Sequence, residues 1–208
     1  MAKQIKGKIL NWYINRNFTD WIFFSKSGMM ALSQVLKYRG NRVSRMIDYR
    51  KMTEWAGGNP ILKKAIVILG KTLPVLVMAL YGATAIFLLV RGSHKLLLFL
   101  AVPALCLIAV TVLRPLINRV RPYDRLGYPP LLNKESGKGK SFPSRHTASA
   151  FVVAAACLYL NPVYGRVMLV LAVLIGATRV LSGVHYLSDV LAGAGFALLC
   201  TLFFFLPV

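Results

Sequence analysis

Five nearly uninterrupted runs of apolar residues follow one another from residue 73 to the end of the chain. About 20 helical residues cross the hydrocarbon of a bilayer, and these runs reach or approach that length, although the third and fourth are short or have polar ends. The pattern therefore predicts an all-α fold, an integral membrane bundle of five transmembrane helices. The predicted spans are 73–90, 96–113, 147–160, 167–181 and 190–206. In the fifth span, Gly193 and Gly195 are small enough to permit close helix packing.

Residues 1–60 have a different pattern. Ile5, Ile9 and Trp12 recur at helical spacing among lysines, and 21–24 is a bulky apolar cluster. A basic and aromatic sequence of this kind is typical of an amphipathic helix that lies in the membrane interface. Two alternatives remain: a soluble helix packed on the membrane domain, or a sixth crossing made by residues 9–24. We expect an interfacial region at 1–60 and a transmembrane domain at 61–208.

Composition supports a membrane protein and excludes an ordinary soluble one. Hydrophobic residues make up 57% of the chain and charged residues only 15%, whereas soluble domains carry about 25% charged residues. The 26 Lys and Arg against 6 Asp and Glu give a formal charge of +20. A nucleic-acid-binding protein would share the charge but would not need so much apolar sequence, so we expect a membrane bilayer and no nucleic acid as partner.

The charge is concentrated in two blocks, residues 1–64 with a net +10 and residues 114–146 with a net +6.

The cysteines give no indication of function. Cys106, Cys157 and Cys200 each lie within an apolar run and show no metal-binding spacing, so we expect buried thiols that pack as small hydrophobic groups.

Three polar stretches lie at the ends of the apolar runs, at 114–122, 142–146 and 178–189. Ionisable residues at membrane depth are energetically unfavourable and are therefore functional candidates. Arg114 and Arg121 are seven positions apart, which would place them on one face of a continuing helix.

The other two stretches offer an anion site and a histidine–carboxylate pair. Ser144, Arg145 and His146 open a predicted helix, whose backbone N–H groups and dipole attract anions. His185 and Asp189 stand at positions i and i+4, so the carboxylate can orient the imidazole if the stretch is helical.

Each stretch also has a purely structural explanation. The arginines could anchor helix ends on the positively charged side of the membrane, Ser144 could be a helix N-cap, and the His185–Asp189 pair could be a satisfied polar contact. The joint occurrence of three arginines, an N-terminal serine and two histidines is hard to ascribe to anchoring. The third arginine is Arg179, in the last stretch.

Together these groups suit phosphoryl transfer. Guanidinium groups offer paired donors to a tetrahedral oxyanion, a carboxylate-oriented imidazole is a nucleophile or base, and a second histidine can protonate the leaving oxygen. The chain contains six acidic residues, of which only Asp124, Glu135 and Asp189 lie near the candidate stretches. A two-metal site needs a larger cluster of ligands, so we expect no catalytic metal and no cofactor.

The order and spacing of these residues resemble the type-2 phosphatidic acid phosphatase superfamily, membrane lipid phosphate phosphatases that share a site with vanadium haloperoxidases. The family signature is Lys-x6-Arg-Pro, then Pro-Ser-Gly-His, then Ser-Arg-x5-His-x3-Asp. This chain has Arg114 for the lysine, Arg145 for the glycine and Thr178 for the serine, and otherwise matches all three motifs in order.

The resemblance implies a role for each site residue. His185 would be the nucleophile, Asp189 its orienting partner and His146 the general acid. The phosphate-binding groups would be Arg114, Arg121, Ser144 and Arg179, with the backbone N–H groups of Arg145 and His146. Only the backbone of Arg145 is expected at the phosphate, so its side chain would contact the substrate's headgroup or a second phosphate.

The implied function is hydrolysis of a phosphomonoester or diphosphate on a lipid through a phosphohistidine. Phosphatidic acid, phosphatidylglycerol phosphate and undecaprenyl diphosphate all fit a site at headgroup depth, and the residues do not rank them. The alternatives are a lipid phosphotransferase with the same phosphohistidine, a small transporter and a non-catalytic membrane scaffold.

The location that we expect is a bacterial cell membrane. With five spans, the three polar stretches and the basic N-terminal block fall on one side, which the positive-inside rule places in the cytoplasm. A sixth crossing at residues 9–24 would place the site on the opposite face.

Overall fold

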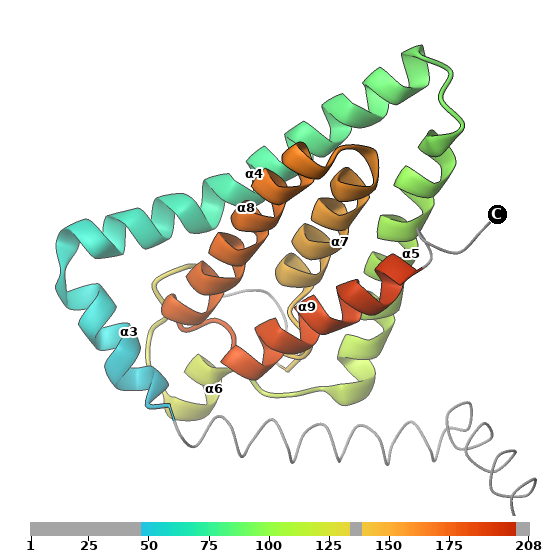
Figure 1. The fold of residues 1–208 in the computed structure, drawn as a ribbon. Helices are drawn as coiled ribbons and strands as arrows, with labels where there is room; N and C mark the ends of the chain where they lie inside the picture. The colour runs from blue at the N-terminus through green and yellow to red at the C-terminus, as the bar shows by residue number, and fades with distance from the viewer. Residues whose placement is uncertain (1–46, 134–138, 203–208) are drawn as a thin grey trace, which may run out of the picture. The chain divides into compact units, whose positions relative to one another are not determined.

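The computed structural model describes residues 47–133 and 139–202, all within one compact unit of the chain, and every regular element in these ranges is a helix (Figure 1). The prediction of an all-α fold is therefore confirmed. The predicted interfacial helix and the alternative crossing at residues 9–24 lie outside the described residues. The helices are α3 (Tyr49–Gly58), α4 (Pro60–Val90), α5 (Lys95–Ile117), α6 (Pro122–Leu126), α7 (Arg145–Leu160), α8 (Pro162–Leu181) and α9 (Leu187–Thr201).

Each of the five predicted spans corresponds to one helix, in the order α4, α5, α7, α8 and α9. The largest difference is at α4, which begins at Pro60 rather than at residue 73. The side chain of Asn59 caps the helix by accepting the N–H groups of Ile61 and Leu62 at 3.0 and 3.1 Å, and proline is favoured at the first helical position. Hydropathy misses these first turns because lysines occupy them, while capping makes them helical.

The lengths and surfaces of the helices fit a bilayer. Three stretches are long and apolar enough to cross a membrane, namely α4, α8 and Lys95–Leu126, which contains α5 and α6; α7 and α9 are shorter and apolar. Large hydrophobic side chains are exposed on the outer faces, among them Ile86, Leu97, Val170 and Leu198. An apolar surface of this extent is stable in hydrocarbon and not in water, so the protein is an integral membrane protein.

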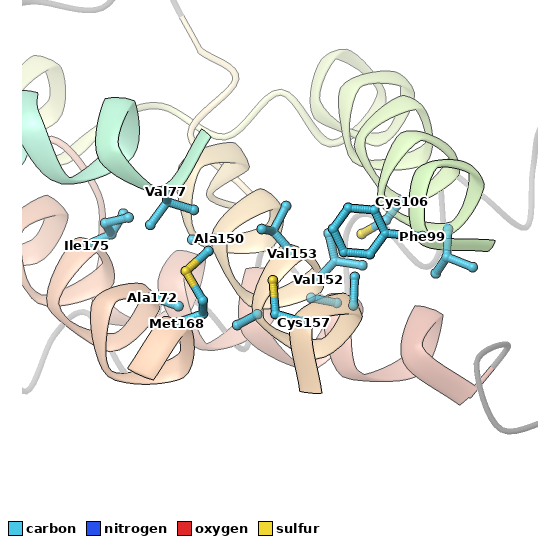
Figure 2. Close-up of a cluster of buried hydrophobic side chains, with 14 of the residues drawn as sticks. Val77, Phe99, Cys106, Ala150, Val152, Val153, Cys157, Met168, Ala172 and Ile175 are labelled. Atoms are coloured by element: carbon cyan, nitrogen blue, oxygen red, sulfur yellow. The ribbon is translucent and has the colours of Figure 1, made fainter. Parts of the chain in front are cut away.

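Helix α7 is the centre of the bundle, since it packs against α4, α5, α8 and α9 (Figure 1). Small residues allow this close approach: the buried face of α7 includes Ala148, Ala150, Ala154 and Ala156. Figure 2 shows the resulting core, in which side chains of α7 lie between Phe99 and Cys106 of α5 and Met168, Ala172 and Ile175 of α8.

The cysteines take the structural role expected of them. Cys106 and Cys157 are buried in this core and Cys200 is partly buried against it, all as free thiols. They pack as small apolar side chains.

A glycine brings α9 against the N-terminus of α7. A Cβ atom added to Gly193 would lie 2.7 Å from the carbonyl oxygen of Ser144, whereas one added to Gly195 would meet nothing within 4 Å. Close packing was predicted for both glycines, and it is found only at Gly193. This contact sets how near the start of α9 lies to the start of α7.

Gly193→Ala should therefore destabilise the bundle by about 1–3 kcal/mol, because the added methyl group overlaps a backbone oxygen that cannot rotate away. Gly195→Ala is the matched control, two residues along the same helix, and should be neutral or stabilising by up to about 1 kcal/mol. Equilibrium unfolding in detergent measures both. Equal stabilities of the two variants would contradict this account of the contact.

Candidate active site

The three polar stretches meet at one end of the bundle, in the lower part of Figure 1, where α5 and α8 end and α7 and α9 begin. Most of the predicted site residues are buried there, none of them more than 6% exposed. These are Arg114, Arg121, Ser144, Arg179, His185 and Asp189. His146 is partly exposed and the side chain of Arg145 is exposed at the start of α7.

His185 and Asp189 form the predicted pair. The Nδ1 atom of His185 lies 3.4 Å from Oδ2 of Asp189, and neither side chain is exposed. The pair does not depend on a shared helix, because α9 begins at Leu187 and His185 lies in the preceding turn. Instead, Asp189 is fixed in the first turn of α9, where the backbone N–H of Tyr186 donates to its Oδ2 at 3.0 Å.

Two further side chains donate to Asp189. The hydroxyl of Ser141 donates to Oδ2 at 2.5 Å, and a terminal nitrogen of Arg119 donates to Oδ1, also at 2.5 Å. Neither residue was among the predicted site residues. Their positions carried a signal, since Arg119 lies within the stretch 114–122 and Ser141 immediately precedes 142–146.

The arginines are oriented by backbone carbonyls. Arg114 donates to the carbonyl of Lys140 through Nε, at 2.9 Å, and through a terminal nitrogen. Arg179 donates to the carbonyl of Gly70 at 2.7 Å. These bonds tie the end of α5 to the segment before α7 and the end of α8 to α4.

The prediction that Arg114 and Arg121 share one helix face is wrong. Helix α5 ends at Ile117, because Asn118 adopts the left-handed conformation with φ 44°, which terminates helices. Arg121 is the residue before α6 and donates to the carbonyl of Val184 at 3.2 Å. It therefore reaches the vicinity of His185 by a loop and not along a helix.

Ser144 caps helix α7, which is the structural role that the sequence offered as an alternative to phosphate binding. It is the N-cap of α7, and its hydroxyl oxygen accepts the N–H of Thr147 at 3.4 Å and the hydroxyl of Thr147 at 2.9 Å. Its own N–H donates to the carbonyl of Asp189 at 2.9 Å. The N-terminus of α7 is thus bonded directly to the residue that holds His185.

A cluster of tyrosines supports the turn that carries His185. The hydroxyl of Tyr128 donates to the carbonyl of Gly183 at 3.1 Å, and the hydroxyl of Tyr49 accepts the N–H of Leu187 at 3.1 Å. Burial raises the pKa of the Tyr49 phenol, so it remains protonated at neutral pH. Although α3 falls within the predicted interfacial region 1–60, it contributes to the support of the site.

Two adjoining cavities open beside His146. One, of about 580 Å³, is lined mainly by apolar residues of α4, α7 and α8; the other, of about 370 Å³, includes Lys71, Asn133 and Arg179. Pro74, Val75 and His146 line both. A larger cavity, of about 690 Å³, is lined by residues such as Thr84 and Tyr164 and touches none of the predicted site residues. His146 therefore lies between an apolar cavity and one that also exposes the charged side chains of Lys71 and Arg179.

Within the described ranges, no three His, Cys, Asp or Glu side chains gather in a group that could hold a metal ion. The expectation of metal-free chemistry stays a prediction.

Comparison with known proteins identifies relatives. Residues 95–207 match the PAP2 superfamily. The bacitracin transport permease protein BcrC of Bacillus licheniformis is 32% identical over 128 residues, which are 60% of this chain and 62% of that protein. Lipid A 1-phosphatase of Rhizobium johnstonii is 34% identical over 90 residues, 41% of this chain and 36% of that protein. The chain thus spans less than two thirds of the length of either relative.

Two solved structures share the fold. One is a transmembrane PAP2-type phosphatidylglycerolphosphate phosphatase from Bacillus subtilis, with a TM-score of 0.62 and 24% identity over 87% of this chain and 94% of that one. The other is LpxE of Aquifex aeolicus, with a TM-score of 0.60 and 24% identity over 76% of this chain and 92% of that one. Since the family match covers more than half of the sequence and these structures share its helical arrangement, the chain belongs to the PAP2 superfamily.

Proposed function

We propose that the protein is a membrane lipid phosphatase that hydrolyses a phosphomonoester or diphosphate on a lipid through a phosphohistidine on His185, without a metal ion. The observation that carries this proposal is the convergence of Arg114, Arg121 and Arg179 on the end of the bundle where Asp189 holds His185. Membership of the PAP2 superfamily supports it.

In the first step, Nε2 of His185 attacks the phosphorus atom, a P–N bond forms and the P–O bond to the lipid breaks. Asp189 keeps the Nδ1 proton on the far side of the ring, which leaves Nε2 as the nucleophile. His146, in the first turn of α7, protonates the leaving oxygen. In the second step His146 takes a proton from water and the water oxygen attacks the phosphorus atom. A new P–O bond forms, the P–N bond to His185 breaks and inorganic phosphate leaves.

Positive charge and hydrogen-bond donors stabilise the phosphoryl oxygens during both steps. The three arginines supply the charge, and the N-terminus of α7 supplies backbone donors. Ser144 accepts both of the bonds that Thr147 donates to it. A hydroxyl has one hydrogen of its own to donate, so Ser144 can cap α7 and bind a phosphate oxygen at the same time.

The cavities beside His146 favour an amphiphilic substrate. The cavity of about 580 Å³ suits the first part of a hydrocarbon tail, and the cavity of about 370 Å³, whose lining includes Lys71 and Arg179, suits the headgroup. Two of the similar proteins are described as a lipid A phosphatase and a phosphatidylglycerolphosphate phosphatase, both of which act on lipids. Phosphatidic acid, phosphatidylglycerol phosphate and undecaprenyl diphosphate remain the candidate substrates.

The purified protein should release inorganic phosphate from at least one lipid in a panel of these three classes, with a chelator present throughout. His185→Gln should lower kcat by about 10³-fold or more, because the nucleophile is lost. His94→Gln is the matched control, since His94 is exposed at the opposite end of α5 from Arg114. Loss of the lipid phosphate without release of inorganic phosphate would indicate a phosphotransferase, and loss of activity in the chelator would contradict the metal-free mechanism.

A bulky residue in the apolar cavity should separate tail binding from chemistry. Met78 lines that cavity and not the one with Lys71 and Arg179, so Met78→Trp should lower kcat/KM for long-chain lipid phosphates about tenfold, the equivalent of about two unburied methylene groups. Turnover of a short-chain, water-soluble phosphate ester should change less than about twofold. Val163→Trp, at an exposed position of α8 outside these cavities, is the control. An equal loss on both substrates would contradict a tail site here.

We also propose that the site faces the cytoplasm, on the basis of the basic residues in 1–64 and 114–146. Two reporters can be fused at Gly137, between the first two polar stretches: one that works only in the cytoplasm and one that works only in the periplasm. We expect activity from the cytoplasmic reporter and none from the periplasmic one. A periplasmic signal from that fusion would contradict the cytoplasmic assignment and place the site on the outer face, the side that an additional crossing at residues 9–24 predicts.

A further inference from the structure

Arg119 is a buried arginine that the motif comparison leaves without a role. It lies in the loop between α5 and α6 and is 2% exposed. One of its terminal nitrogens lies 2.5 Å from Oδ1 of Asp189 and 2.7 Å from the hydroxyl of Ser188. Its guanidinium carbon stands 4.0 Å from the centre of the Tyr186 ring. These contacts hold the side chain against the start of α9.

The positive charge of Arg119 is the partner that a buried Asp189 carboxylate needs. A buried carboxylate is energetically unfavourable unless it is paired with a cation or takes up a proton. Protonation of Asp189 would remove the charged acceptor that His185 needs. Arginine suits the pairing because its guanidinium group keeps its proton in proteins. The ion pair with Arg119 therefore allows Asp189 to stay ionised with no exposure to solvent.

The two oxygens of Asp189 have separate partners, and this division orients the carboxylate. Oδ1 accepts from Arg119, while Oδ2 accepts from Ser141 and Tyr186 and lies beside Nδ1 of His185. Donors that hold each oxygen separately restrain the carboxylate against a rotation that would take Oδ2 away from the imidazole. Arg119 also fixes Ser141, whose N–H donates to the carbonyl of Arg119 at 2.9 Å.

We propose that Arg119 is a positioning residue for the nucleophile: it holds Asp189 ionised and in the rotation that presents Oδ2 to His185, and it does not touch the substrate. This inference rests on the proposed function, since it assigns Arg119 to the same reaction. It differs from the roles of Arg114, Arg121 and Arg179, which are proposed to bind the phosphate itself.

Three kinetic results follow from action through Asp189. Arg119→Gln should lower kcat at least tenfold and leave KM for the lipid phosphate within twofold, because the substrate contacts are unchanged. In an Asp189→Asn background the same substitution should cause less than a twofold further loss, since the carboxylate that it positions is absent. Arg119→Lys should recover part of kcat, because an ammonium group can still pair with Oδ1.

Arg166→Gln is the matched control, an exposed arginine in the first turns of α8, away from the site, and its kinetics should equal those of the unmodified protein. Thermal unfolding in detergent identifies any variant that has lost its fold. A raised KM with unchanged kcat would make Arg119 a substrate-binding residue and overturn the proposal. Independent, multiplying losses in Arg119→Gln and Asp189→Asn would also overturn it.

A measurement without turnover separates this inference from the proposed function. The ¹⁵N NMR signals of the His185 ring should shift in the same direction in Arg119→Gln as in Asp189→Asn, whether or not any lipid is hydrolysed. Unchanged His185 signals in Arg119→Gln would overturn the positioning role. Failure of every lipid to yield phosphate, with the shifts present, would count against the proposed function alone.

Discussion

The side chain of Asp189, closed off from solvent, is the constraint on which the site depends. A charge in that position must be satisfied by donors, and the donors come from separate parts of the chain. Arg119 lies 70 residues away and Ser141 lies 48 residues away, while the carbonyl of Asp189 accepts the N–H of Ser144. The loop after α5, the segment before α7 and the start of α9 therefore have to meet around one residue.

The bundle places this meeting point where a membrane substrate could reach it. Helix α7 has 16 residues and α9 has 15, so each is about 24 Å long or shorter at 1.5 Å per residue. That is less than the hydrocarbon thickness of about 30 Å. Helices this short can begin below the membrane surface, so the polar groups at their starts lie where a lipid headgroup could reach them, next to an apolar cavity that His146 also lines. In this arrangement a phosphate and a tail can occupy neighbouring spaces.

The sequence predicted the fold well because a bilayer imposes long apolar runs that hydropathy detects directly. It misplaced the start of α4, where capping by Asn59 extends a helix through lysine-bearing turns. The spacing of Arg114 and Arg121 suggested a shared helix face, but a left-handed Asn118 ends the helix between them. A seven-residue interval cannot by itself reveal a break of that kind.

The predicted site residues were found together because their motifs keep a fixed spacing within each stretch. Arg119 and Ser141 were missed because their partner is distant in the sequence, and neither residue stands in a motif position. A stretch that contains several arginines does not show which of them binds a substrate anion and which neutralises a buried carboxylate. The contacts across the loops show that Arg119 and Ser141 are the residues that pair with Asp189.

The central claim is that His185 carries the phosphoryl group between the lipid and water. It can be tested by mixing the protein with a lipid phosphate that is radiolabelled in its phosphorus, quenching in alkali during turnover, and mapping the labelled peptides. The account predicts an acid-labile, alkali-stable label on His185, absent from His185→Gln and retained in His94→Gln. A label on another residue, or rapid hydrolysis with no labelled intermediate in the same quench, would contradict it.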